Sequence, residues 1–103
     1  MELILEFDCD ADIIDVPQIV IDNRELLRKR FLKWLFNKHN NHGYWVKIRN
    51  NTEGYCLGVR YRSDAFVEFL NKKVLKDNEQ KAVILKQHVS LNEQHIEFPS
   101  IVF

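Results

Sequence analysis

The chain has 103 residues, of which 46% are apolar and 12% aromatic, and its 15 basic and 15 acidic side chains cancel to no formal net charge. This length predicts one domain over residues 1–103, and the aromatic content argues against intrinsic disorder. No apolar run approaches the roughly 18 residues of a membrane-spanning helix, and the acidic first residues lack the basic start of a signal peptide. Two distant cysteines, Cys9 and Cys56, fit a reducing compartment. We therefore expect a cytoplasmic protein with no membrane partner.

The absence of net charge conceals a strong segregation along the chain. Residues 1–23 hold seven acidic side chains and no Lys or Arg, whereas residues 24–63 hold ten basic side chains and two acidic ones. Residues 64–103 are nearly balanced, with five Lys and six acids. Such a chain either folds its acidic arm onto its basic surface or presents two oppositely charged faces to partners. Because charged side chains most often form solvated or internally paired surfaces, we rank internal pairing first.

The first part of the chain predicts one strand followed by an irregular segment. Residues 2–7 largely alternate apolar and polar side chains, which is the period of a half-buried strand. Residues 8–23 have no clear period, and Pro17 argues against a helix within them. Residues 18–21 indicate at most a short extended piece.

A long helix is the clearest signal in the sequence. Asp22, with Glu25 three residues later, predicts its N-terminal cap, and the helix is expected to end by about Lys38. Its core-facing residues recur at helical spacing and are Leu27, Phe31, Trp34 and Leu35. Further apolar residues on its other faces are Leu26, Leu32 and Phe36. We expect another segment or another chain to cover these additional residues.

The second half of the chain predicts a hairpin, a helix and two further strands. The predicted elements are hairpin strands at 44–49 and 55–62, a helix from residue 63 or 64 to about 77, and strands at 82–87 and 95–98. Residues 50–54 are rich in Asn and Gly, which tolerate the backbone of a tight reversal. Pro99 is expected to limit the last strand. The apolar end of the chain, residues 99–103, is expected to be buried against the body or in a dimer.

This order of elements predicts the fold class. It matches a ferredoxin-like split β-α-β-β-α-β arrangement, an α+β fold whose antiparallel sheet has both helices on one face, with an extra C-terminal strand. The first and third predicted strands are neighbours in that arrangement. The acidic residues Glu2 and Glu6, with neighbouring Asp8 and Asp10, would then form cross-strand ion pairs with the basic hairpin, each contributing about 0.2–1 kcal/mol. The basic residues of these pairs would be Lys47, Arg49, Arg60 and Arg62.

Basic and aromatic side chains of the hairpin form one candidate partner-binding set. They are Trp45, Lys47, Arg49, Arg60 and Arg62. We expect the set to share one polar face, where cations would bind phosphates and a flat ring would stack on bases. Residues 54–61 partly resemble the third-strand signature of RNA-recognition domains, from which Gly58 and Glu53 depart. The resemblance implies single-stranded nucleic-acid binding, which we hold as an alternative below internal pairing.

An acidic set after the first strand is the second candidate. It consists of Asp8, Asp10, Asp12 and Asp15. In extended chain the first three carboxylates point to one side, an arrangement that suits Mg²⁺. A divalent-metal-dependent enzyme using Asp8, Asp10 and Asp12 is therefore a second alternative. A solvated or internally paired acidic edge is the commoner outcome, so we assign no metal site.

His39 and His42 could supply two zinc ligands, with Cys9 or Cys56 as a third. A structural zinc site usually shows two paired clusters of ligands, and the sequence shows one. Spacing alone therefore leaves zinc binding as a hypothesis.

No motif in the sequence assigns a reaction. There is no nucleophile elbow, and the three glycines form no phosphate-binding loop. We therefore expect no catalytic residues and no cofactor. The sequence favours a small non-enzymatic interaction module that binds another macromolecule, with a protein partner or a homodimer as the expected assembly. By analogy of class alone, such a chain suits a bacterial inhibitor or immunity-type protein, or an accessory protein of a mobile element.

Overall fold

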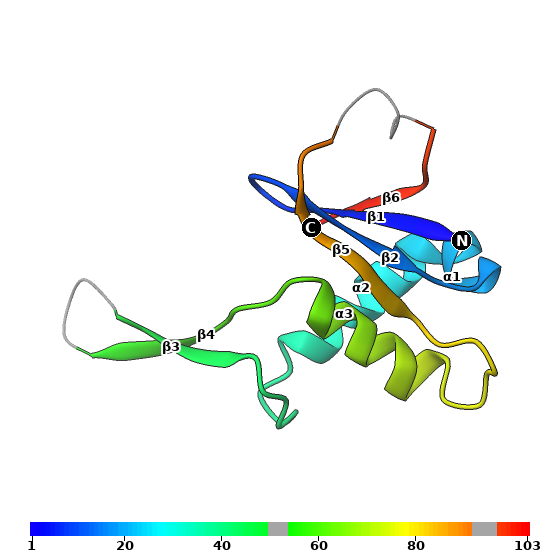
Figure 1. Ribbon diagram of the computed structural model, residues 1–103. Helices are drawn as coiled ribbons and strands as arrows, with labels where there is room; N and C mark the ends of the chain where they lie inside the picture. Colours follow the sequence, from blue (N-terminus) through cyan, green and yellow to red (C-terminus); the bar gives the residue numbers. More distant parts are fainter. Residues whose placement is uncertain (50–53, 92–96) are drawn as a thin grey trace.

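The computed structural model describes residues 1–49, 54–91 and 97–103 and shows a small α+β fold. Its elements are β1 (Glu2–Glu6), β2 (Ala11–Asp15), α1 (Gln18–Asp22), α2 (Arg24–Leu35), β3 (Trp45–Arg49), β4 (Tyr55–Val59), α3 (Ser63–Phe69), its π-helical continuation η1 (Leu70–Val74), β5 (Val83–Val89) and β6 (Ser100–Val102). One mixed sheet has the strand order β5-β2-β1-β6, and β3 and β4 form a separate two-stranded sheet. In Figure 1, α2 and α3 lie on the same side of the larger sheet, and the β3–β4 hairpin extends away from both.

The segment after the first strand is regular, contrary to expectation. β2 pairs antiparallel with β1, so that Leu3 lies opposite Ile14 and Ile4 opposite Ile13. Ile14 belongs to the main core and Ile13 to a second cluster of buried residues. Because adjacent residues of β2 are buried on opposite faces, the strand lacks the alternation of apolar and polar side chains by which a half-buried strand is found.

A short helix follows Pro17, where the sequence predicted an extended piece. Proline lacks a backbone N–H, but the N–H groups at the start of a helix have no partner within it. Pro17 is therefore compatible with its place as the N-cap of α1, which begins at Gln18. Val20 and Ile21 of this helix are buried in the core. The next helix, α2, is confirmed, although Asn23 and not Asp22 is its capping residue and makes no side-chain capping bond.

The last strand lies further along the chain than predicted. β6 begins after Pro99 and pairs parallel with β1, with Ile4 opposite Ser100. Residues 95 and 96 of the predicted strand lie outside the described residues, and Phe98 lies in a bend. The expected burial of the C-terminal end is confirmed in part: Ile101 is 1% exposed and Phe103 packs on the core, but Val102 is 61% exposed. The parallel pairing of β1 with β6 joins segments far apart in the sequence, so the periodicity of either segment does not predict it.

The strand order differs from the predicted ferredoxin-like arrangement. That arrangement places the first strand beside a strand of the hairpin, but here β1 lies between β2 and β6. Both edges of β1 are thereby paired, and the hairpin forms its own sheet. Among the described residues, Glu2 and Glu6 therefore form no cross-strand ion pair with Lys47, Arg60 or Arg62.

Phe31 of α2 is the centre of the hydrophobic core. Its side chain is fully buried, and its ring lies 5.2 Å from that of Phe66 and 5.6 Å from that of Phe103, measured between centroids. Phe66 belongs to α3, and Phe103 follows β6. One aromatic side chain thus joins both long helices to the C-terminal end of the chain.

Phe31→Ala is expected to lower the free energy of unfolding by about 4 kcal/mol, because it leaves a cavity between α2 and α3. Urea unfolding followed by circular dichroism measures this change. Phe36→Ala is the matched control, since Phe36 is 56% exposed, and it is expected to change stability by less than about 1 kcal/mol. Similar losses in the two variants would contradict the central position of Phe31.

Candidate interaction site

A buried carboxylate links three elements of the fold. Asp12 of β2 is fully buried, and its Oδ1 accepts a hydrogen bond from Arg62 Nη2 at 2.7 Å. Its Oδ2 accepts bonds from the Ser63 hydroxyl at 2.5 Å and from the Ser63 backbone N–H at 3.3 Å. The backbone N–H of His88 in β5 donates to Oδ1 at 3.0 Å. Both oxygens are therefore hydrogen-bonded, by groups from the start of α3 and from β5.

Asp10 extends this cluster to the surface. Its Oδ1 lies 2.7 Å from the same Arg62 nitrogen, and its Oδ2 lies 2.8 Å from His88 Nδ1. The guanidinium of Arg62 also lies over the Phe7 ring, with Cζ 4.5 Å from the ring centroid, in a cation–π contact. Part of the acidic N-terminal segment therefore pairs with a basic residue, as the internal-pairing hypothesis predicted. The pair is not formed across neighbouring strands of one sheet, because Asp10 and Asp12 lie after β1 and in β2 whereas Arg62 lies just before α3.

The cluster shifts the pKa values of its members in opposite directions. Burial raises the pKa of Asp12, but hydrogen bonds from Arg62, from Ser63 and from the His88 backbone outweigh it and lower that pKa to about 2. Hydrogen bonding to Arg62, and next to His88, lowers the pKa of Asp10. The bond to Asp12 in turn raises the pKa of Arg62. The two carboxylates and the guanidinium are therefore all charged at neutral pH.

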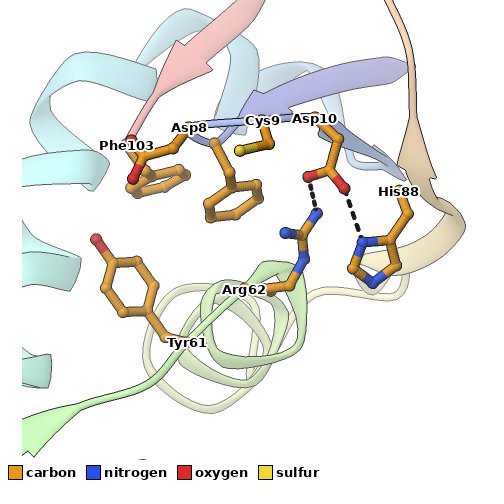
Figure 2. Close-up of a pocket in the computed structure, with 8 residues that line it drawn as sticks. Asp8, Cys9, Asp10, Tyr61, Arg62, His88 and Phe103 are labelled. Atoms are coloured by element: carbon orange, nitrogen blue, oxygen red, sulfur yellow. Dashed lines mark hydrogen bonds and ion pairs between the residues drawn. The ribbon is translucent and has the colours of Figure 1, made fainter.

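A pocket of about 530 Å³ opens beside the cluster (Figure 2). Its lining residues are Phe7, Asp8, Cys9, Asp10, Tyr61, Arg62, His88 and Phe103. The rings of Phe7 and Phe103 stack with centroids 5.5 Å apart. Because Arg62 and His88 each bind Asp10 at its edge, the pocket offers aromatic walls beside the paired Asp10 carboxylate and the exposed Asp8.

No group of three His, Cys, Asp or Glu side chains is placed to hold a metal ion in the described part of the chain. Arg62 lies between Asp10 and Asp12, in the place that a cation shared by these carboxylates would take. The geometry therefore gives no support to the metal-dependent enzyme considered from the sequence.

His42 is engaged within the fold and is not free to bind zinc. Its Nδ1 accepts the Tyr44 backbone N–H at 3.2 Å, so its Nε2 carries the proton and donates to the Leu35 carbonyl at 2.7 Å. A zinc ligand needs an unshared ring nitrogen. The zinc ligand pair considered for His39 and His42 therefore has no support in the geometry of the described residues.

The base of the hairpin is anchored to the end of α2. Trp45 Nε1 donates to the Asn40 carbonyl at 2.9 Å, and the Trp45 ring stacks on His42 with centroids 5.1 Å apart and planes 8° apart. Tyr44 and Val59 pack against the main core. One face of the Trp45 ring is therefore covered inside the protein.

The register of the hairpin overturns the predicted single polar face. β3 and β4 pair antiparallel with Lys47 opposite Leu57 and Val46 opposite Gly58. Residues directly opposite each other share a face, so Lys47 lies beside apolar Leu57. Arg60, two residues beyond Gly58, belongs to the other face. The length of the connecting loop sets which residues of β3 and β4 lie opposite each other. Aligning the two strands by polarity alone predicted the wrong register.

The described part of the hairpin carries several exposed side chains. Leu57 is 60% exposed, and Lys47 and Arg60 are exposed and make no ion pair within the described residues. The side chain of Arg49, also in the predicted set, lies outside the described residues. Within residues 1–49, 54–91 and 97–103, β3 and β4 pair only with each other. The hairpin therefore presents an apolar side chain and two cations to solvent.

The acidic candidate set is divided by the structure. Asp10 and Asp12 bind Arg62, and Asp15 Oδ1 lies 2.7 Å from the N-terminal ammonium of Met1. Asp8 is exposed in the turn between β1 and β2.

Sequence reasoning missed two members of the cluster, Ser63 and His88. They lie 51 and 76 residues from Asp12 along the chain. No local motif could have joined residues so far apart.

Comparisons of the chain with protein-family models, curated proteins and solved structures found no match. Among the described residues, no helix has the length and apolar character needed to cross a membrane. Function is therefore inferred from the geometry alone.

Asp12→Asn is expected to lower the free energy of unfolding by about 3 kcal/mol, because it leaves Arg62 with one carboxylate in a partly buried site. Chemical unfolding at pH 7 measures this loss. Asp8→Asn is the control, since Asp8 is exposed, and it is expected to change stability by no more than about 0.5 kcal/mol. Equal stability of the two variants would show that the Asp12 pair is dispensable.

Stability is expected to fall as the pH decreases from about 4 to about 2. The pKa of Asp12 is lowered from 3.8 to about 2 on folding, so the unfolded chain takes up this proton first. The stabilisation, about 2 kcal/mol, is complete above the unfolded pKa and is lost as the pH falls through the folded one. Unfolding at a series of pH values measures it. In Asp12→Asn the slope should be correspondingly smaller, and an unchanged slope would assign the effect to other groups.

Proposed function

We propose that the protein is a small non-enzymatic interaction module that binds another protein through the β3–β4 hairpin. The observation that carries this proposal is the isolation of the hairpin, which among the described residues packs on the core at its base through Tyr44 and Val59. Two strands without a third strand or a covering layer are marginally stable in water. A partner that packs on the hairpin would supply the missing layer.

The surface of the hairpin favours a protein partner. Leu57, 60% exposed, lies on one face with Lys47. An apolar anchor bordered by a cation is typical of the centre and rim of a protein interface. Residues 44–49 and 54–60 contain no acidic side chain. The partner is therefore expected to carry acidic residues around an apolar pocket.

Single-stranded nucleic acid is the second candidate, because Lys47 and Arg60 are exposed and make no ion pair within the described residues. Exposed cations are what phosphates require. Two contacts weigh against this candidate: Arg62 is bound by two carboxylates, and one face of the Trp45 ring is covered by His42. Base stacking needs an open ring.

Leu57→Thr is expected to weaken binding of a partner at least tenfold, because it removes the exposed apolar anchor while keeping a residue that favours strands. The partner is identified by cross-linking to the hairpin and its affinity is measured by titration calorimetry with purified proteins. Ile19→Gln is the matched control. It removes an apolar side chain of similar exposure, 56%, from α1 and is expected to leave the affinity unchanged.

A partner that binds Leu57→Thr as tightly as the unaltered chain would exclude the hairpin as the binding element. Fluorescence anisotropy with short single-stranded RNA and DNA, at low salt and at about 150 mM salt, tests the second candidate. Micromolar binding that weakens with salt and is lost in a Lys47→Glu/Arg60→Glu variant would replace the protein partner with nucleic acid.

A further inference from the structure

The hydrogen-bond phase of the hairpin shows which backbone groups are open to a third strand. The Arg60 N–H donates to the Tyr44 carbonyl at 2.9 Å across the hairpin. Bonded and non-bonded pairs alternate along an antiparallel ladder, so the Lys47–Leu57 pair is non-bonded. The N–H and C=O groups of these two residues therefore point outward, one residue toward each open edge of the hairpin.

The two edges differ in charge. The outward positions of β3 include Lys47 and Arg49, and charged residues on an edge strand oppose pairing with another chain. β4 has no charged residue in Tyr55–Val59, and its central residue, Leu57, is 60% exposed. The edge of β4 is therefore the one that the sequence leaves unprotected.

The edge of β4 is complementary to itself. A two-fold axis at Leu57 sets this residue opposite Leu57 of a second copy, and it sets Tyr55 opposite Val59. Beyond the strand, Arg60 falls opposite Gly54, so no like charges meet across the seam. The same operation on β3 would set two Lys47 residues opposite each other. The distribution of charge therefore favours pairing through the edge of β4, and the self-complementarity of that edge favours a second copy of the chain as the partner.

We infer that two copies of the chain pair through the outer edges of β4 and form a four-stranded antiparallel sheet from their two hairpins. The pairing uses the outward backbone groups of β4 and brings two exposed Leu57 side chains together. Lys47 and Arg49 then occupy both outer edges, so the assembly closes as a dimer. The inference rests on the proposed function in taking the hairpin as an open binding element. A seam of five residues per chain is short, and a weak, concentration-dependent dimer is expected.

Complementary charges at Leu57 test this seam in the purified full chain. Leu57→Lys and Leu57→Asp each place like charges opposite each other across the axis, so each is expected to weaken dimerisation at least tenfold. Equimolar mixing of the two variants is expected to restore association, because Lys then faces Asp. Sedimentation equilibrium from about 5 to about 500 µM protein measures the dissociation constants. Ile19→Lys and Ile19→Asp make charge changes at a similarly exposed position of α1 and are expected to leave the dimer intact.

Proline variants give a second test that does not depend on charge. Leu57→Pro removes an outward N–H of β4 without touching the β3–β4 ladder, and it is expected to weaken the dimer at least tenfold. Lys47→Pro makes the same change on the β3 edge and is expected to leave dimerisation unchanged. Circular dichroism checks that both variants are folded.

An unaltered chain that stays monomeric over the whole concentration range would overturn the inference. An equimolar mixture of Leu57→Lys and Leu57→Asp that associates no more strongly than either variant alone would overturn it as well. The proposed function is judged separately by calorimetry with the cross-linked partner. A monomeric chain that binds such a partner through Leu57 would remove the dimer and retain the proposed function. A dimer that Leu57→Pro disrupts, in a chain that binds no other protein, would support the seam alone.

Discussion

The buried Asp12 carboxylate is the interaction on which the arrangement of the other elements depends. A charge without solvent contact is tolerated only when it is paired and hydrogen-bonded, and Asp12 obtains its bonds from Arg62, Ser63 and His88. One side chain of β2 thus fixes the start of α3 and the course of β5. His88 has a φ of 56°, an uncommon value outside glycine, and its N–H bond to Asp12 is made from this conformation.

Arg62 connects this cluster to the hairpin. It follows β4 closely and is bound by Asp10 and Asp12, while the other end of the hairpin is held by the Trp45–His42 stack against α2. The hairpin therefore leaves the body between two anchored ends. An arm with a fixed base loses less conformational entropy when it binds than a flexible loop would.

The segregation of charge along the chain has two outcomes in the fold. Part of the acidic arm pairs with Arg62, and Lys47 and Arg60 remain exposed without an ion pair among the described residues. Asp12 and Arg62 were both recognisable from the sequence as candidate binding residues, but not as partners of each other. The partner face and the dimer seam share Leu57: the face uses its side chain, and the seam uses the backbone edge of β4. A dimer would therefore present two adjacent copies of the face.

The sequence by itself determined α2, the hairpin and α3, because each shows its own period in its apolar residues, as Phe31 and Leu35 do in α2. It did not reveal β2, whose Ile13 and Ile14 are buried on opposite faces. Only the tertiary structure decided that β1 lies between β2 and β6, and that Arg62 meets Asp12 across 50 residues of chain. Packing between segments distant in sequence determines which strands are neighbours in a sheet and which residues form a buried ion pair. Local periodicity predicts the individual elements but not these contacts.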